Sequence, residues 1–539
     1  MSSKTAAALI FLTLGLTCPS VSSFASSGSH RTCTGASTRT RANTALSSAI
    51  ADAPIEVSAL EEQKEQPFDW YKSWYPLAAV DDLDKEKPHQ FFLLGMPIVI
   101  WFDGKPADGV GKFESKKNRK SKKVDRVGGE WRAFVDECSH RKVPLSEGRV
   151  EDDGSLLCSY HGWRFNGDGN VIDVPQVDED EMAKIRANPK SNCNKFPAQL
   201  IDGILWVWAD NGKDASLEAA LTAPPVIPRP PGAEELVKEL PWNWRELPYS
   251  HDYFIENVVD PAHVTISHHG IVGDRYDDQS LQVEVVDSLS KTGFSILAHT
   301  NMNEKPTTTT FTAPSSVDIS APFGDGGCSQ LQLYVSPSRP GFCNHIGRQV
   351  IVKDSSGVLP QFLKQFAVPM PRWLQHLVSS VFLNQDGLFL HKQERHLAST
   401  GQYSTMKPGC EEKSDFSKLV CATSTDLGVM NFRKWMSVMA GGHIPYKYGD
   451  LTVPPTSNDV VYDVWNAHTK NCKTCLDALK NLKKARFAAF ATSAFVGLAR
   501  PFGVVKSIVS SIVLAAVGLL MNKVMGLFFK YETSHADNN

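Results

Sequence analysis

The sequence predicts an α+β protein, in which a small antiparallel β domain precedes a larger mixed α/β domain and a hydrophobic helical C-terminus. Three observations lead to this prediction. Short strand-like runs broken by Gly and Asp turns fill residues 70–212. A Pro-rich stretch over 213–239 interrupts regular hydrogen bonding. Helical and alternating patterns then mix over 240–470, and two uncharged apolar runs, 487–499 and 507–521, lie within 485–530.

The bulk composition narrows the class of protein. A chain of 539 residues exceeds what one hydrophobic core usually serves. Its 56 basic and 59 acidic residues give a net charge of -3, without the one-sided field that a nucleic-acid binder needs. Eleven cysteines are too sparse for a disulfide-stapled scaffold. We therefore expect no nucleic-acid partner, and local cysteine motifs matter more than their number.

Residues 1–60 have the composition of a targeting segment and are excluded from the fold. Lys4 precedes an apolar run over 6–16, which outlines a secretory signal. Residues 25–50 are rich in Ser, Thr and Ala, with no acidic residue before Asp52, as in a transit peptide. Together they look like the bipartite presequence of algae whose plastids lie inside extra membranes. A secretory signal followed by a disordered linker is the alternative.

The elements of the β domain follow from apolar and aromatic runs. Residues 98–102, 131–135 and 204–208 predict strands, and the Gly-containing sequence at 166–169 predicts a turn. A basic stretch interrupts this pattern, and we expect a solvated insertion, with a docking patch for acidic ferredoxin or anionic lipid as the alternative. Its members are Lys112, Lys116, Lys117, Arg119, Lys120, Lys122, Lys123 and Arg126.

The second domain mixes helix and strand. Helices are predicted near 250–268 and 372–396, and a strand at 331–335. Beyond it, neither of the apolar runs 487–499 and 507–521 alone reaches the length that is decisive for a membrane span. The second run can extend further if a lysine snorkels to the interface. Membrane-anchor helices over 485–530 are the prediction, and a buried or interfacial helical hairpin is the alternative.

Two short motifs in the β domain pair a thiolate with an imidazole. Cys138-Ser-His140 and Cys158-Ser-Tyr-His161 each lie beside a turn. The four residues could bind zinc, but zinc fingers usually pair Cys with Cys and His with His. In a Rieske [2Fe–2S] cluster one iron takes both Cys and the other both His, which fits the alternation here. Quinol-oxidising Rieske proteins have a second cysteine in each loop, and the two loops here have no such additional cysteine.

A carboxylate and two imidazoles crowd together at Asp260, His263 and His268. On a helix Asp260 and His263 share a face, but His268 lies about 140° round from His263. Both histidines can reach one metal only if the helix ends or bulges between them. Two His and one carboxylate form the facial triad of non-haem Fe(II) oxygenases. Asp386 is our choice as the third ligand. The alternatives, which could equally be solvated or hydrogen-bonded, are His269, His391 and Glu394.

From about residue 68 to the C-terminus, these motifs resemble the plastid branch of Rieske oxygenases, most closely the pheophorbide a oxygenases. The likeness rests on the two ligand motifs, on Trp70-Tyr-x-x-Trp-Tyr-Pro76, on Asn257-x-x-Asp260-Pro-Ala-His263, on Cys472-Lys-Thr-Cys475 and on the apolar tail. It implies a Rieske domain over 70–212 and a helix-grip, START-like catalytic domain.

The resemblance also implies a mechanism. A [2Fe–2S] cluster loaded by reduced ferredoxin would pass electrons from His140 or His161 through Asp260. A mononuclear non-haem Fe(II), held by His263, His268 and Asp386, would use O₂ to oxidise a chlorophyll-derived tetrapyrrole. Oxygenolytic ring opening of pheophorbide a is the first expectation, at a plastid envelope or thylakoid membrane, by a homotrimer. The alternatives are hydroxylation of chlorophyllide, protochlorophyllide or a bilin, a translocon-associated redox protein, or a sterol-oxidising relative.

The pair Cys472 and Cys475, in the segment 471–484, has the spacing of a reversible disulfide. In the family that it resembles, this motif is associated with thioredoxin. Two free thiols, or half of a metal site, are the alternatives. Because the sequence has no second C-x-x-C motif, redox regulation is the prediction.

Overall fold

The structure is a computed structural model. It describes residues 67–106, 126–232, 236–269, 273–276, 280–299, 305–360, 363–364, 369–400, 419–448 and 452–532. The predicted presequence and the basic residues from Lys112 to Lys123 lie outside these ranges.

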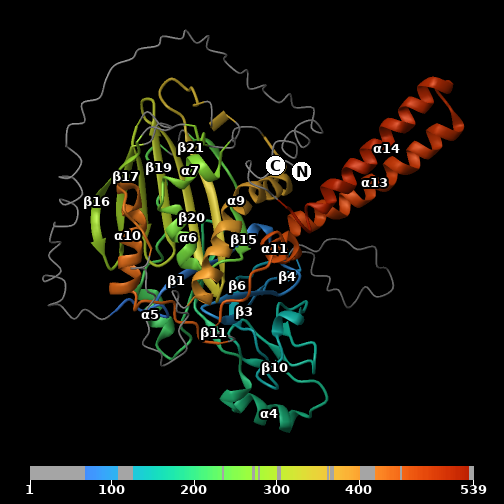
Figure 1. Cartoon of the computed structure of the whole chain (residues 1–539). Helices are drawn as coiled ribbons and strands as arrows, with labels where there is room; N and C mark the ends of the chain where they lie inside the picture. The colour runs from blue at the N-terminus through green and yellow to red at the C-terminus, as the bar shows by residue number, and fades with distance from the viewer. Residues whose placement is uncertain are drawn as a thin grey trace, which may run out of the picture. The chain divides into compact units, whose positions relative to one another are not determined.

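The first domain consists of small antiparallel sheets (Figure 1). One has the order β1-β13-β12 and the second β11-β6-β3-β2. The strands are β1 (Trp74–Ala79), β2 (His89–Leu93), β3 (Met96–Phe102), β6 (Trp131–Val135), β11 (Lys195–Phe196), β12 (Ala198–Ile201) and β13 (Ile204–Trp208). The three predicted strands are confirmed. β3 is apolar throughout because it faces two cores: Ile98 and Ile100 pack into one, Val99 and Trp101 into the other.

A third sheet, of order β10-β9-β8-β7, carries the loops of the Cys-His motifs. Its strands are β7 (Arg149–Val150), β8 (Leu156–Leu157), β9 (Arg164–Phe165) and β10 (Val171–Asp173), followed by α4 (Glu179–Ala187). One motif lies between β6 and β7, and the other lies between β8 and β9. The first loop therefore joins the second sheet to the third, and the second loop lies within the third.

Arg126 corrects part of the predicted basic insertion. It begins β5 (Arg126–Val127), which pairs with β4 (Lys105–Pro106), and is only 3% exposed. Its guanidinium donates to the carbonyls of Gly104 (2.8 Å) and Glu151 (2.9 Å) and pairs with Glu86. Because a buried charge needs such partners, Arg126 holds the β domain together and is not part of a solvated patch.

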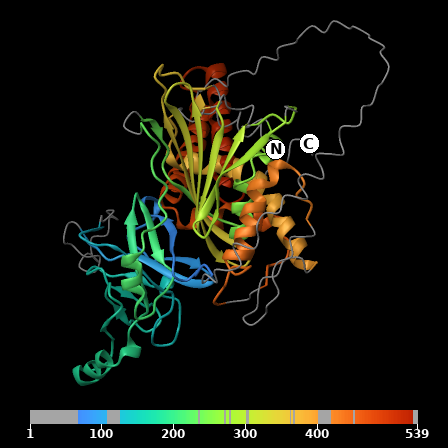
Figure 2. The ribbon, with the colours of Figure 1, turned by 90° about the vertical axis from the view of Figure 1, so that its left-hand side faces the viewer.

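The second domain is built on one antiparallel sheet of order β14-β21-β20-β19-β18-β17-β16, with β15 also paired to β21 (Figure 2). The strands are β14 (Leu236–Glu239), β15 (Asn243–Leu247), β16 (Gln282–Ser290), β17 (Gly293–His299), β18 (Thr307–Thr312), β19 (Ser316–Phe323), β20 (Gly327–Arg339) and β21 (Phe342–Val352). The Pro-rich linker predicted over 213–239 is shorter in the structure, because α5 (Ala215–Leu221) and β14 take up its ends.

Helices α6 (His251–Val258) and α10 (Leu427–Lys434) lie across one face of this sheet (Figure 1). The helix predicted near 250–268 is two helices, α6 and α7 (His263–Ser267). Pro261 explains the break, because proline lacks an N–H and disfavours helical geometry in the residue before it. The second predicted helix is α9 (Arg372–Ser399).

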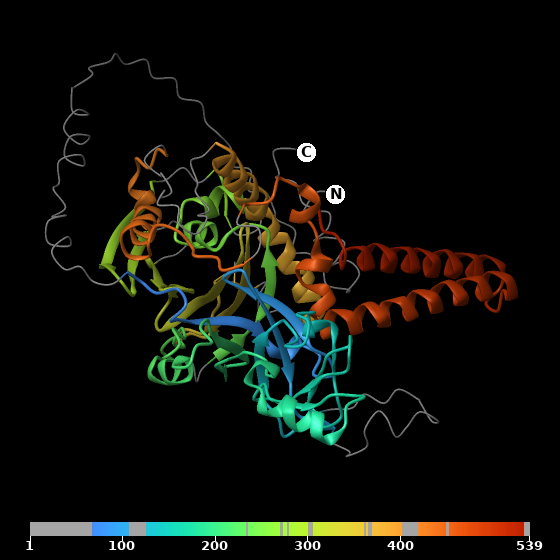
Figure 3. The same ribbon diagram turned by 90° about the horizontal axis from the view of Figure 1, so that it is seen from below.

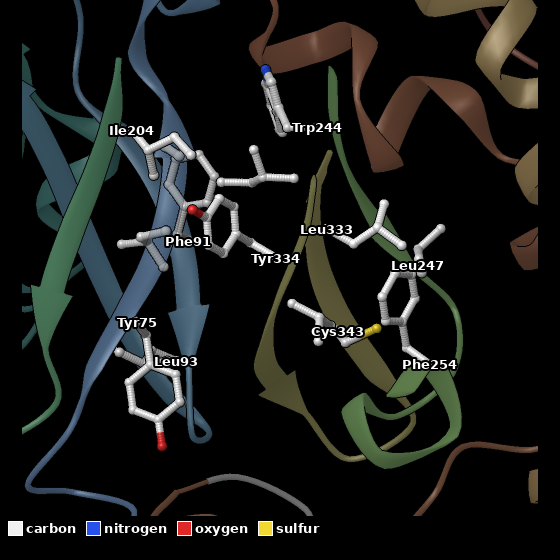
Figure 4. Close-up of a cluster of buried hydrophobic side chains, with 14 of the residues drawn as sticks. Tyr75, Phe91, Leu93, Ile204, Trp244, Leu247, Phe254, Leu333, Tyr334 and Cys343 are labelled. Atoms are coloured by element: carbon white, nitrogen blue, oxygen red, sulfur yellow. The ribbon is translucent and has the colours of Figure 1, made fainter. Parts of the chain in front are cut away.

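The two domains share a hydrophobic core. Tyr75, Leu93 and Ile204 of the β domain lie opposite Leu247 and Leu333 of the second domain (Figure 4). Backbone hydrogen bonds join the same surfaces, from Leu94 N to Pro337 O (2.8 Å) and from Gly95 N to Ser338 O (2.7 Å). The β domain is therefore fixed to the large sheet of the second domain.

The chain ends in a helical hairpin of α13 (Lys473–Ala499) and α14 (Val504–Gly526) (Figure 3). Among the described residues, α14 alone is long and apolar enough to cross a membrane, with a mean hydropathy of 2.2 over 18 residues. Only 11% of that window is buried in the protein. Of the predicted anchor helices, one therefore has the composition of a span.

Candidate metal centres

The two Cys-His loops have the same backbone structure. In each, the N–H of Cys138 or Cys158 donates to the carbonyl five residues later, at 2.8 and 2.9 Å. The N–H four residues later donates back to the cysteine carbonyl at 2.9 Å in both loops. That residue has a positive φ, +60° at Lys142 and +75° at Gly162. The paired loops thus present their cysteines in matching positions, and His140 and His161 follow these cysteines by two and three residues.

The side chains of these loops are arranged to receive a metal. Cys138 and Cys158 are both buried and free. His140 stacks on Trp163, with ring centroids 4.8 Å apart, and lies 4.7 Å from the ring of His161. Its Nδ1 is buried with no hydrogen-bond partner, which leaves the lone pair for a metal. Burial also raises the pKa of the Cys138 thiol to about 12, so only a tightly bound cation would hold it as a thiolate.

The pattern of donors distinguishes a cluster from a single ion. Each loop offers one thiol and one imidazole, whereas zinc fingers usually pair Cys with Cys and His with His. This alternation fits a [2Fe–2S] cluster, in which one iron takes the two Cys and the other takes the two His.

A second donor group lies where α7 ends beside α9. The donor atoms of His263, His268 and Asp386 all lie within 4.8 Å of one another. His268 Nε2 is 3.1 Å from Asp386 Oδ2, and His263 Nε2 is 3.9 Å from the same oxygen. The helix ends at Ser267, and His268 leaves helical geometry with a ψ of 26°. The prediction that the helix must end between the two histidines is therefore confirmed.

Hydrogen bonds orient all three side chains. His263 Nδ1 donates to the carbonyl of Asp260 (2.6 Å), and His268 Nδ1 donates to Gln385 Oε1 (3.0 Å). Each ring therefore turns its Nε2 toward the carboxylate, and these two nitrogens are the atoms that would bind a metal. Asn257 donates to Asp386 Oδ2 (3.0 Å) and so helps to hold the carboxylate in place.

Electrostatics also prepares this group for a cation. Burial by itself would raise the pKa of Asp386, but the hydrogen bond from His268 and the proximity of His263 lower it below the ordinary value. The carboxylate therefore stays ionised although it is only 7% exposed. Two imidazoles and one carboxylate leave coordination positions open, as a mononuclear Fe(II) oxygenase site requires.

The alternative ligands have other partners. His391 donates from Nδ1 to Pro248 O (2.7 Å) and accepts from Ser457 N (3.0 Å). Glu394 accepts from Ser250 and pairs with Arg395, and His269 accepts from Arg275 N. None of these side chains belongs to the donor groups found among the described residues.

Asp260 lies beside the site, with its Oδ2 3.9 Å from His263 Nδ1.

One further donor group was foreseen only in part, because half of a metal site was an alternative for Cys472 and Cys475 but its histidines were not identified. His376 and His468 join Cys472 and Cys475 within 4.8 Å, and all four are buried. His468 stands four residues before Cys472, so the pattern H-x₃-C-x₂-C carried a signal that the search for a second C-x-x-C overlooked. His376 lies on α9, far away in sequence, and no local pattern marks it.

Comparison with known families agrees with both iron centres. The sequence profile of the Rieske [2Fe-2S] domain matches residues 73–197, which include both Cys-His loops. The profile named pheophorbide a oxygenase matches residues 311–404, which include Asp386.

Curated relatives share most of the chain at low identity. Flavonoid 8-hydroxylase 2, chloroplastic, of Ocimum basilicum is 26% identical over 90% of this chain and 88% of its own. Pheophorbide a oxygenase, chloroplastic, of Oryza sativa subsp. japonica is 29% identical over 78% and 75%. Protochlorophyllide-dependent translocon component 52 of Arabidopsis thaliana is 26% identical over the same shares. A crystal structure of dicamba monooxygenase covers 69% of this chain at 18% identity, with a TM-score of 0.47.

Proposed function

Since this chain is a Rieske non-haem iron oxygenase of the family that includes chloroplastic pheophorbide a oxygenase and flavonoid 8-hydroxylase, we propose that it oxidises a chlorophyll-derived tetrapyrrole with O₂ and electrons from reduced ferredoxin. Oxygenolytic opening of pheophorbide a is the first candidate reaction. The observation that carries this choice is the pheophorbide a oxygenase profile, which covers β18 to α9 and therefore the element that bears Asp386.

Each side chain has a proposed role. Cys138, Cys158, His140 and His161 hold the cluster, and His263, His268 and Asp386 hold the iron. When bound, the cluster supplies single electrons and the iron activates O₂. The chain itself fixes ligand orientation: Asp260 and Gln385 hold the outer nitrogens of the two histidines. The ring of Phe382 lies flat against His268, 3.8 Å between centroids, and keeps water from that face.

Asp260 is the proposed bridge for electrons between the cluster and the iron. Its carbonyl touches a proposed iron ligand, and 29% of its side chain is exposed, so a histidine from another subunit can reach it. This fits the homotrimer that the resemblance implies. We expect Asp260→Asn to lower turnover by roughly 10–100-fold while cluster and iron contents stay unchanged. Asp274→Asn, at the exposed Asp paired with His269, is the control, and an equal loss there would contradict the role.

Membrane attachment through α14 is proposed from its exposed apolar surface. Val509, Ile512 and Leu519 are each more than half exposed, and 11% of the apolar window is buried. The chloroplastic relatives support a plastid location, and we propose that the protein acts at the envelope or thylakoid membrane. The composition of residues 1–60 is the basis for proposing an alga with a complex plastid. Vesicle flotation tests this: Ile512→Asp should reduce binding, and Val420→Asp, which changes an exposed valine elsewhere, should not.

Flavonoid hydroxylation is the second candidate, because the flavonoid 8-hydroxylase aligns over 90% of this chain. The deciding assay incubates the purified protein with reduced ferredoxin, ¹⁸O₂ and either pheophorbide a or a flavone. We expect label in an opened tetrapyrrole. A labelled hydroxyflavone with intact pheophorbide would move the substrate to the flavonoid class, and hydroxylation of another pigment would move it within the tetrapyrroles. No turnover with any of them would favour a translocon-associated redox role.

A further inference from the structure

The group formed by His376, His468, Cys472 and Cys475 lies outside the oxygenase machinery. The two sulfurs are fully buried, and each imidazole is only 4% exposed. His376 Nδ1 lies 3.1 Å from His468 Nε2, 3.3 Å from Cys475 Sγ and 3.6 Å from Cys472 Sγ. Cys475 Sγ is 3.5 Å from His468 Nε2. Separations of this size are those between the corners of one coordination tetrahedron.

The outer nitrogens of the two imidazoles show which atoms carry protons. His468 Nδ1 lies 2.6 Å from the carbonyl of Trp244 and must donate to it. His376 Nε2 faces a carboxylate oxygen of Asp82 at 3.5 Å, which places the proton of a neutral ring there. Both inner nitrogens are then bare lone pairs that face each other at 3.1 Å. Two facing lone pairs repel each other, and a cation bound between the nitrogens would remove this repulsion by accepting both lone pairs.

The cysteines meet the same requirement from the helix side. Cys472 is the N-cap of α13, and its sulfur accepts the backbone N–H of Cys475 at 3.3 Å. A hydrogen bond from a backbone N–H stabilises a thiolate, which is the form that binds metal. The two cysteines are not joined as a disulfide. Both sulfurs face the two imidazoles, which a thiol pair acting alone does not need.

We propose that His376, His468, Cys472 and Cys475 bind one Zn²⁺ in a closed tetrahedral site. Two thiolates and two neutral imidazoles make a preferred ligand set for structural zinc, and four protein donors leave no position for substrate. The site ties α9 to the start of α13, and through the Trp244 carbonyl to β15. It therefore anchors the C-terminal hairpin and steadies the helix that carries Asp386.

Outer contacts support the same four ligands. Asp82, from the β domain, accepts from Arg372 (2.9 Å) and from Thr474 Oγ1 (2.8 Å) while it faces His376. Thr474 lies between the two cysteines, so both halves of the motif are held in place. Carboxylate partners of this kind orient metal-binding histidines.

The test is zinc K-edge absorption spectroscopy and metal analysis of the full-length protein. We expect one zinc per chain, with two sulfurs at about 2.3 Å and two nitrogens at about 2.0 Å. Zinc misplaced in the iron site would show no sulfur. The Cys475→Ser variant should lose this zinc and keep the Rieske electron paramagnetic resonance signal. The His468→Cys variant should keep the zinc, which would then have three sulfur ligands. Cys421→Ser, at an exposed cysteine, is the matched control.

Two results would overturn the proposal. One is a wild-type protein without sulfur-bound zinc in which both cysteines react with a thiol reagent in the native state. The other is a Cys472–Cys475 disulfide found by mass spectrometry in protein purified without reductant, which would favour the redox regulation predicted from the spacing. Both measurements use the wild-type protein, so they decide even if the Cys475→Ser variant fails to fold.

Discussion

Helix α9 contributes to two donor groups that differ in how completely they would enclose a metal. Near its start, His376 joins one imidazole and two thiols, whereas Asp386, ten residues later, joins two imidazoles. Ten residues of helix separate the groups by about 15 Å. Three donors leave open positions for O₂, and four leave none. The difference assigns stability to the start of α9 and chemistry to its middle.

The surroundings of the groups agree with this division. His376, His468, Cys472 and Cys475 are all buried, but 16% of the His263 side chain is exposed. A reacting site needs a path for substrate, whereas a structural metal gains from exclusion of water. Substitutions in the two donor groups should therefore impair different properties, turnover in one case and stability in the other.

The largest expected effect is on turnover. His263→Ala removes one of three proposed iron ligands, so we expect iron binding and oxidation to be abolished. The Rieske electron paramagnetic resonance signal and the thermal midpoint should remain near wild-type values. His299→Ala, at a half-exposed histidine paired with Glu284, is the matched control. Product formed by the His263→Ala protein would refute the assignment of the iron site.

The next effect is on stability. Cys475→Ser should lower the free energy of unfolding by about 4 kcal/mol or more, because it removes a ligand of the proposed zinc site from a buried cluster. Iron at His263, His268 and Asp386 should remain bound at low temperature. Chemical denaturation in parallel with iron analysis measures both. If the Cys475→Ser variant lost iron and turnover while its free energy of unfolding stayed near the wild-type value, the two donor groups on α9 would not have separate roles.

A smaller effect should come from outside the ligand set. Gln385→Ala removes the oxygen that holds His268 Nδ1, and we expect iron affinity to fall by roughly 10–100-fold. Gln375→Ala is the control. Gln375 lies on the same helix, and its side-chain amide donates to the carbonyl of Met370. Metal competition with a chelator measures the change, and equal affinities of the two variants would remove Gln385 from the site.

The sequence predicted what is local. Each Cys-His loop closes on itself through hydrogen bonds within six residues, so a short motif was enough to find it. The end of α7 at His268 followed from the angle between two side chains on one helix. His376 was missed because its partners come from the end of the domain, and only the fold brings them together. Arg126 was misjudged because its charge run suggested solvent, whereas its partners are backbone carbonyls from neighbouring strands.

The smallest expected effect concerns a polar group on α9 that binds no metal. Burial raises the pKa of Glu394 to about 7, against the opposing effects of Arg395 and Ser250. Since the ordinary value is 4.5, the protonated carboxyl is favoured in the folded state. The stability that it contributes is fully present below about pH 4.5 and is lost as the pH rises through 7, about 3 kcal/mol in all. Denaturation midpoints from pH 5 to 8 should therefore fall more steeply for the wild type than for Glu394→Gln. Parallel profiles would mean that Glu394 is already ionised at pH 5, and that Arg395 and Ser250 outweigh the effect of its burial.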